Sequence, residues 1–199
     1  MSFKKKSPFI SVIMNCHNGE KYLKESLKSV KSQTFKNWEL IFYDNNSSDN
    51  SKIEFKKFNE KRFKYFSSKK FLALYDARNK AIEKSKGKYL AFLDVDDIWT
   101  KDKLQKQVLL IKKSYFQMVY SNYKILYQKD KSKIIKYNKK LPSGNITQEL
   151  LKEYCINIST LLVEKKILLK NKFNRLYSII GDFAFNIHIR TNNIVFQCA

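Results

Sequence analysis

The chain has 199 residues and carries 40 Lys and Arg against 18 Asp and Glu, a formal charge of +22. Its hydrophobic content of 43% is enough for a substantial core and excludes a disordered chain. No apolar run approaches the roughly 18 residues of a transmembrane helix. The apolar stretch at 9–14 is too short for a signal peptide.

The positive charge does not by itself indicate a nucleic-acid partner. Only four of the basic residues are arginines, and the lysines are spread along the whole chain. Arginine is the residue expected for bidentate contacts to bases and phosphates. We therefore expect no specific nucleic-acid binding, and keep a lysine-rich nucleic-acid binder as a minor alternative. A loose attraction to an anionic membrane face remains an expectation.

Three cysteines without metal-ligand spacing are typical of a reducing compartment. The expected location is cytoplasmic, with peripheral association on the inner face of the cell membrane.

Apolar runs alternate with helical patterns over the first half of the chain. Strands are predicted at 9–14, 38–43, 63–66 and 89–93. Helices are predicted at 19–33, at 50–58, from Ala73 to a cap at Gly87, and at 101–112. This order predicts an α/β fold, a three-layer α/β/α sandwich with a mostly parallel central sheet.

The pattern is looser after residue 117. The expected elements are a strand or hairpin at 118–127, an exposed charged excursion at 129–140, a helix capped by Thr147, a strand at 158–163, a helix opened by Gly181 and Asp182, and a strand at 194–196. We find no repeat and no linker, so one domain over residues 1–199 is expected.

Three carboxylates, Asp94, Asp96 and Asp97, follow the apolar run at 89–93. They repel one another at neutral pH unless a cation neutralises them. A divalent metal with hard oxygen ligands suits them. The alternative is a polar turn before a helix capped by Thr100. Asn15 and Asp44 are expected beside the cluster, because the carboxyl ends of parallel strands share one edge where ligands bind.

Five segments, taken in order, resemble glycosyltransferase family 2, whose members have the GT-A nucleotide-sugar-binding fold. They are SVIMNCHNGEKYL at 11–23, SQTFKNWEL at 32–40, DNNSSD at 44–49, ARNKA at 77–81 and GKYLAFLDVDDIW at 87–99. The resemblance implies a nucleotide-sugar-binding half at 8–115 and an acceptor-side half at 116–199.

The resemblance also implies roles for residues that bind the donor. Asp44 and Asn45 stand where the family recognises the base and ribose, and the alternative for them is an Asx turn. Arg78 stands near the diphosphate, and its alternative is a surface ion pair. Asn15 stands in the first loop, where a proline is common, so this loop is expected to grip the nucleotide differently.

The metal and the base are assigned in the same way. Asp94-Val95-Asp96 matches the family's DXD motif, with Asp94 orienting the sugar or ribose. Asp96 and Asp97 would hold Mn²⁺ or Mg²⁺ against the two phosphates. Asp182 matches the catalytic base, for which the alternative is a helix cap. The stretch 157–160 resembles the lining of the acceptor side.

The implied activity is inverting, metal-dependent and non-processive transfer of a sugar from a UDP-linked donor to a hydroxyl of a cell-surface glycan or lipid-linked acceptor. It would serve polysaccharide or lipopolysaccharide biosynthesis. Because the chain ends at Ala199, earlier than most members, a truncated and inert paralogue that binds nucleotide sugar is kept as the alternative. A nucleotidyltransferase is a weaker alternative, because 15–21 has no Gly-rich phosphate loop.

Overall fold

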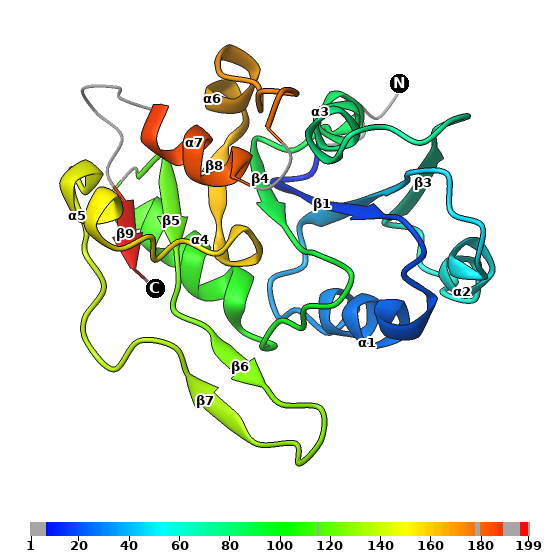
Figure 1. Cartoon of the computed structure of the whole chain (residues 1–199), viewed down its shortest axis with the longest axis horizontal. Helices are drawn as coiled ribbons and strands as arrows, with labels where there is room; N and C mark the ends of the chain where they lie inside the picture. The colour runs from blue at the N-terminus through cyan, green and yellow to red at the C-terminus, as the bar shows by residue number, and fades with distance from the viewer. Residues whose placement is uncertain (1–6, 115, 178–179, 189–195, 199) are drawn as a thin grey trace, which may run out of the picture.

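The computed structural model describes residues 7–114, 116–177, 180–188 and 196–198. A seven-stranded sheet crosses the molecule in the order β3-β2-β1-β4-β8-β5-β9 (Figure 1). Its strands are β1 (Ile10–Cys16), β2 (Trp38–Asp44), β3 (Phe63–Ser67), β4 (Tyr89–Phe92), β5 (Met118–Tyr120), β8 (Leu162–Glu164) and β9 (Phe196–Cys198). Only β8 runs against its neighbours, β4 and β5, so the sheet is mostly parallel as predicted.

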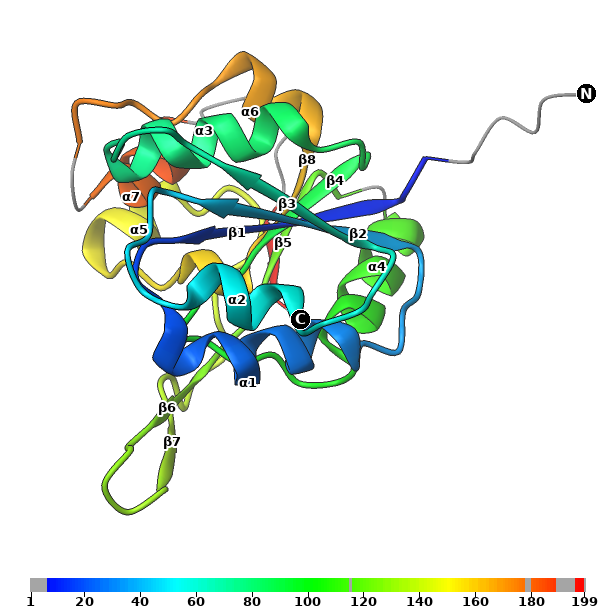
Figure 2. The ribbon, with the colours of Figure 1, turned by 90° about the vertical axis from the view of Figure 1, so that its right-hand side faces the viewer.

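Helices cover both faces of this sheet, as Figure 2 shows edge-on. One layer holds α3 (Leu74–Lys84), α5 (Thr147–Lys152), α6 (Lys165–Lys170) and α7 (Gly181–His188). The other holds α1 (Glu20–Lys31), α2 (Ser51–Lys56) and α4 (Lys103–Ser114). Alternate residues of β1 enter the two cores, Ile13 on the α3 side and Val12 and Met14 on the α1 side. The predicted three-layer sandwich is confirmed.

The elements of the first half lie close to their predicted ranges, but two details were wrong. β1 continues to Cys16, so Asn15 lies inside the strand rather than beyond it. Gly87 does not cap α3, which ends at Lys84 with Ser85 as its C-cap. A Cβ on Gly87 would lie 2.4 Å from the backbone nitrogen of Ser11. Gly87 is therefore needed for close contact with β1.

The second half departs further from the expected pattern. Residues 158–160 form a 3-10 helix before β8, where a continuous strand was predicted. Thr147 is the first residue of α5 rather than its cap, and the cap position is held by Ile146. Helix α6 was not predicted. The predicted strand at 194–196 is β9 at Phe196–Cys198, with 194–195 outside the described residues.

A second, two-stranded sheet is formed by β6 (Lys124–Leu126) and β7 (Lys133–Ile135). It is an antiparallel hairpin that projects away from the large sheet in both Figure 1 and Figure 2. Among the helices of the described segments, none is long and apolar enough to cross a membrane.

Lys103, at the start of α4, is only 7% exposed. Its Nζ lies 3.8 Å from the centre of the Trp99 ring and has no hydrogen-bond partner among the described residues. Burial lowers the pKa of this amine well below its ordinary value. Because the unfolded chain then binds more protons than the folded one, stability should rise with pH toward the ordinary pKa of about 10.4.

We expect Lys103→Met to remove this dependence. Relative to the variant, the wild-type free energy of unfolding should rise by up to about 1.4 kcal/mol per pH unit between the lowered pKa and the ordinary one. Urea unfolding of both proteins at several pH values from 8 toward 10 measures the difference. If the free energy of unfolding changes with pH equally in the two proteins, the buried amine of Lys103 does not cause the dependence.

Candidate active site

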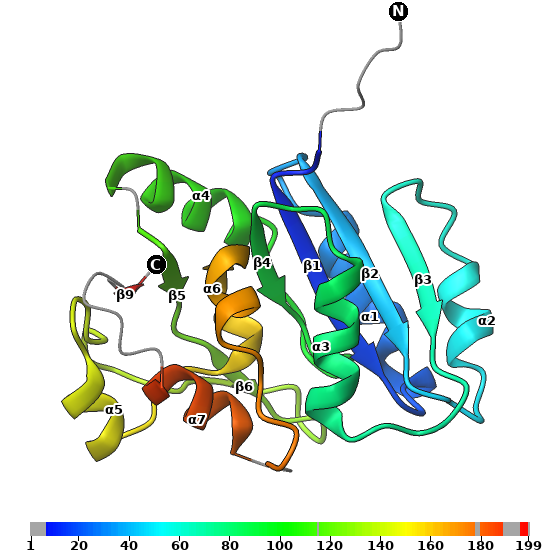
Figure 3. The same cartoon turned by 90° about the horizontal axis from the view of Figure 1, so that it is seen from above.

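The acidic segment follows β4 in the middle of the sheet. After Phe92 the chain turns, and the backbone N–H of Asp97 donates to the carbonyl of Asp94 at 3.1 Å. Asp96 is exposed, whereas Asp94 and Asp97 are partly buried. Figure 3 shows β4 beside β1, with which it pairs in parallel. Because the cluster follows the last residue of β4, Phe92, its predicted position at the carboxyl edge of the sheet is confirmed.

Asp94 pairs with Arg78 across the space between β4 and α3. The guanidinium Nη2 lies 3.3 Å from Oδ1 of Asp94. The arginine side chain is only 4% exposed and the aspartate 42%. The guanidinium carbon lies 5.4 to 5.9 Å from the ring centres of Tyr75, Phe92 and Phe173. Arg78 is therefore a buried cation that holds Asp94, not a member of a surface ion pair.

Burial acts on two carboxylates of the cluster. Desolvation raises the pKa of Asp94, with Arg78 opposing it and the charges of Asp97, Asp96 and Asp182 adding to it. Desolvation also raises the pKa of Asp97, partly offset by a hydrogen bond from Ser159. A bound cation would favour the charged form of both groups.

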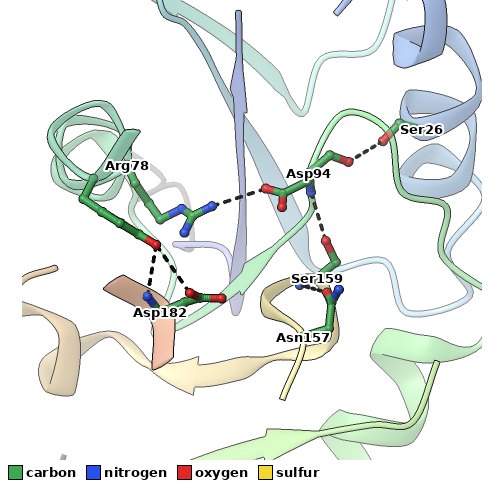
Figure 4. A network of polar contacts seen from close by, with 7 residues as sticks. Ser26, Arg78, Asp94, Asn157, Ser159 and Asp182 are labelled. Atoms are coloured by element: carbon green, nitrogen blue, oxygen red, sulfur yellow. Dashed lines mark hydrogen bonds and ion pairs between the residues drawn. The ribbon is translucent and has the colours of Figure 1, made fainter. Parts of the chain in front are cut away.

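Ser159, in the 3-10 helix, fixes the shape of the acidic turn. Its hydroxyl accepts the backbone N–H of Asp94 at 3.1 Å, and its carbonyl accepts the indole N–H of Trp99 at 2.8 Å. Its own N–H donates to Oδ1 of Asn157 at 2.8 Å. The turn after β4 is thus held from the segment that precedes β8 (Figure 4).

Asp182 lies at the start of α7, where Tyr75 of α3 holds it. The backbone N–H of Asp182 donates to the tyrosine oxygen at 3.2 Å, and the hydroxyl donates to Oδ1 of Asp182 at 3.4 Å. A Cβ on Gly181 would lie 2.3 Å from the Tyr75 ring, so only glycine fits before Asp182. Burial, followed by the charge of Asp182, raises the pKa of Tyr75.

Asp94 and Asp182 face one cavity of about 240 Å³. The chain separates them by 88 positions, and they come from opposite halves of the sequence. The cavity is lined by Asp94, Tyr123, Tyr154, Cys155, Ile156, Asn157, Ile158 and Asp182. The structure therefore brings Asp94 of the acidic turn and the candidate base to the same opening. Asp96 and Asp97 do not line it, so the cavity contains only part of the predicted site.

Asp44 and Asn45 lie at the end of β2 and do not line this cavity. The Asp44 carboxylate accepts from the N–H of Ser47 at 2.9 Å and the hydroxyl of Tyr65 at 2.6 Å. The Asn45 amide bonds both the N–H and the carbonyl of Leu72. These two side chains hold the loops beside β2. Neither caps α2, as the Asx-turn alternative required, because the N-cap residue of α2 is Asn50.

Asn15 presents a different feature. It shares the sheet face of Ile13, on the side of α3, because β1 side chains alternate. Its Nδ2 is buried and has no hydrogen-bond partner among the described residues. A buried amide that lacks a partner costs free energy unless a ligand or water supplies one.

Sequence reasoning missed Tyr154, which lines the cavity, and Asn186, which contacts Tyr154. Tyr154 accepts a hydrogen bond from Nδ2 of Asn186 at 2.9 Å, and burial raises its pKa above the ordinary value. Asn186 follows Asp182 by four positions, on the same face of α7. That spacing was the one signal in the sequence that could have pointed to this pair.

No three His, Cys, Asp or Glu side chains within the described ranges are close enough together to hold a metal ion. Mg²⁺ in phosphate-transfer sites is commonly held by one or two carboxylates, with substrate phosphates completing its shell. The exposed Asp96 and the half-buried Asp97 fit that donor set.

The sequence of this chain is similar to those of known glycosyltransferases. The family model for glycosyl transferase family 2 matches residues 11–176. A UDP-Glc:α-D-GlcNAc-diphosphoundecaprenol β-1,3-glucosyltransferase of Escherichia coli, WfgD, is 37% identical over 117 residues, which cover 59% of this chain and 46% of that protein. A putative teichuronic acid biosynthesis glycosyltransferase of Bacillus subtilis, TuaG, is 30% identical over 80% of this chain and 63% of its own length.

Solved structures share the fold. TarS of S. aureus in complex with UDP-GlcNAc has a TM-score of 0.78 at 19% identity, with 96% of this chain and 58% of that chain covered. The mannosyltransferase PcManGT of Pyrobaculum calidifontis, in complex with GDP-Man and Mn²⁺, has a TM-score of 0.68 over 97% of this chain and 57% of that one. The chain thus spans about half to two thirds of these relatives, and with the family model matched across most of its length it belongs to glycosyl transferase family 2.

Proposed function

We propose that this protein transfers a sugar, with inversion, from a UDP-linked donor to a hydroxyl of a lipid-linked or cell-surface glycan. The observation that carries the proposal is the shared cavity of Asp94 and Asp182. It provides a carboxylate for the donor side and a second carboxylate for the acceptor side in one opening. The matched E. coli relative is named for a UDP-glucose donor and a diphosphoundecaprenol acceptor.

The acidic turn would bind the donor. Asp96 and Asp97 would hold a divalent cation, Mn²⁺ or Mg²⁺, which when bound neutralises negative charge on the diphosphate leaving group. Arg78, which opposes the rise in the pKa of Asp94 caused by burial, would hold this carboxylate for contact with the sugar or ribose. The Nδ2 of Asn15, for which the described residues supply no hydrogen-bond acceptor, could donate to an oxygen of the donor. Asp44 and Asn45 would act through the loops that they hold beside the nucleotide.

Asp182 would act as the general base. As the acceptor oxygen forms its bond to the anomeric carbon, the bond from that carbon to the diphosphate oxygen breaks, and the nucleoside diphosphate leaves with the electron pair. The proton of the acceptor hydroxyl passes to the Asp182 carboxylate. The Tyr75 hydroxyl, which contacts both the backbone N–H and the carboxylate of Asp182, holds that carboxylate in place.

A thermal-shift screen tests this function. The protein is heated with UDP, GDP, CDP and dTDP sugars, each with and without Mn²⁺, and UMP with Mn²⁺ is the control that lacks a diphosphate. We expect stabilisation by UDP-linked sugars that depends on the metal, because binding to the folded state alone raises the unfolding temperature. Stabilisation by none of the nucleotide sugars would overturn the proposal. Stabilisation by the sugars of another nucleotide would show that UDP is not the nucleotide of the donor.

A further inference from the structure

The β6–β7 hairpin exposes an unusual amount of apolar surface. Five large apolar side chains are 37% to 54% exposed: Ile125, Leu126, Tyr127, Ile134 and Ile135. They lie within eleven residues of the sequence, on an element that projects from the body of the protein (Figure 1). Exposed apolar side chains that gather on one element, rather than being scattered singly, commonly mark an interaction surface.

The strand register distributes these side chains over both faces of the hairpin. Ile125 lies opposite Ile134, and Leu126 lies opposite Lys133. Residues opposite each other share a face and neighbours alternate. One face of the paired strands is therefore apolar, with Ile125 and Ile134, and the other combines Leu126 and Ile135 with Lys124 and Lys133. Neither face is covered by the large sheet, and a lone two-stranded hairpin is only marginally stable in water. A partner that contacts both faces at once would therefore stabilise the hairpin.

The hairpin and the residues that follow it are strongly basic. Residues 124–140 contain seven lysines and a single acidic residue, Asp130. Lys139 pairs with Glu153 at 2.8 Å. The other six lysines form no ion pair within the described part of the chain. A partner for this surface should therefore be anionic as well as apolar.

We propose that the hairpin over residues 124–136 inserts into the surface of an anionic lipid bilayer. Its lysines would contact lipid phosphates while its Ile, Leu and Tyr side chains enter the boundary between headgroups and acyl chains. A bilayer can contact both faces of a projecting hairpin. A second copy of this chain fits less well, because two hairpins of the same strong charge repel each other.

The hairpin is connected directly to the cavity. Tyr123, the residue before β6, lines the cavity with Asp94 and Asp182. The carbonyl of Tyr123 accepts the N–H of Lys136 at 2.9 Å, which closes the base of the hairpin. Docking would therefore hold the cavity next to the bilayer, where a lipid-linked acceptor presents its sugar. This last step rests on the proposed function, whereas lipid binding itself does not.

Vesicle co-sedimentation tests the proposal with the full chain and no substrate. The vesicles are phosphatidylcholine alone, or phosphatidylcholine and phosphatidylglycerol in equal parts. One variant combines Lys124→Gln, Lys131→Gln and Lys133→Gln. Its matched control combines Lys56→Gln, Lys112→Gln and Lys170→Gln, which removes the same charge from exposed positions on α2, α4 and α6.

A second pair of variants tests the apolar contribution. The hairpin variant combines Leu126→Ser, Ile134→Ser and Ile135→Ser. Its control combines Ile53→Ser, Leu109→Ser and Leu169→Ser, three side chains that are 52% to 57% exposed elsewhere. Circular dichroism of all four variants verifies that each is folded.

We expect the wild type to bind the anionic vesicles and not the neutral ones. The hairpin lysine variant should bind at least tenfold more weakly, since each lysine near an anionic surface contributes about fivefold. The apolar variant should also lose about tenfold, and both controls should bind within about twofold of the wild type. In a Tyr127→Trp variant, the emission of the new indole should shift to the blue when it enters anionic vesicles. The native Trp38 and Trp99 are buried, so their emission should not change on lipid contact.

Three results would overturn the proposal. The first is equal vesicle binding by a hairpin variant and its control. The second is the absence of wild-type binding to anionic vesicles. The third is a stronger effect of the hairpin lysines on binding to single-stranded nucleic acid than on binding to vesicles. Failure of UDP binding in the thermal-shift screen would leave the vesicle result unaffected, so the two proposals fail separately.

Discussion

The Asp182→Asn variant should lose sugar transfer almost completely while it still binds the donor. A positioned general base contributes about 10²- to 10⁴-fold to a rate, and an amide cannot accept the acceptor proton at neutral pH. We expect kcat to fall by about that factor, with the donor-induced thermal shift unchanged. The measurement is single-turnover release of UDP in the presence of an acceptor.

The chain offers a matched control for this substitution. Asp76 occupies the first turn of α3 as Asp182 occupies the first turn of α7. It lines a different cavity, of about 550 Å³, on the outer side of α3. Asp76→Asn removes an equivalent helix-terminal charge and should leave kcat nearly unchanged. Equal loss of activity in the two variants would show that charge at helix ends, rather than proton transfer, is what matters.

The same experiment addresses the inert alternative. A protein that only binds nucleotide sugar would release no UDP in the wild type, and Asp182→Asn would then change nothing. Slow hydrolysis of the donor by the wild type, lost in the variant, would show that the base works even when the correct acceptor has not been found.

The fold of the first half could be predicted because its signals are local. Strands β1, β2 and β4 are largely apolar segments of four to seven residues and each helix has one apolar face, so burial and periodicity agree. The acidic turn was found for the same reason, since it interrupts such a run at a strand end. These features depend on residues that are close together in the sequence.

The contacts that shape the site are not local and could not be predicted in this way. Ser159 holds the turn at Asp94 across 65 positions, and Tyr75 holds Asp182 across 107. A serine in a polar stretch and a tyrosine on a helix occur in many proteins for other reasons, so the sequence alone did not indicate these two contacts. Gly87 was mistaken for a helix cap because its actual reason, close contact with β1, depends on tertiary packing.

The β6–β7 hairpin shows a different limit of prediction from the sequence. Residues 124–126 and 133–135 are strands with exposed side chains on both faces, so burial imposes no clear alternation on them. The sequence predicted a strand or hairpin at 118–127, which includes β6, and an exposed, charged excursion at 129–140. The exposure is confirmed for most of 129–140, but β7 within it was not predicted and Tyr137 is buried. The sequence did not predict that five apolar side chains would be exposed with the lysines.

The metal-dependent part of donor binding should be lost when Asp96→Ala and Asp97→Ala are combined. A ligand at a hundred times its Kd stabilises a protein by about 2.7 kcal/mol. We expect most of that stabilisation by UDP with Mn²⁺ to disappear in the double variant, because no carboxylate of the pair is left to hold the cation. Thermal unfolding with and without the metal measures it.

The double variant should fold at least as well as the wild type without ligand, which separates lost binding from unfolding. The charges of Asp96 and Asp97 both raise the pKa of Asp94, so they destabilise its charged form. Their removal relieves this repulsion and should not lower the ligand-free unfolding temperature. A variant with Asp102→Ala and Asp130→Ala removes two other carboxylates and should keep the full metal-dependent shift. If UDP and Mn²⁺ still stabilise the Asp96 and Asp97 variant as strongly as the wild type, the acidic turn does not hold the metal.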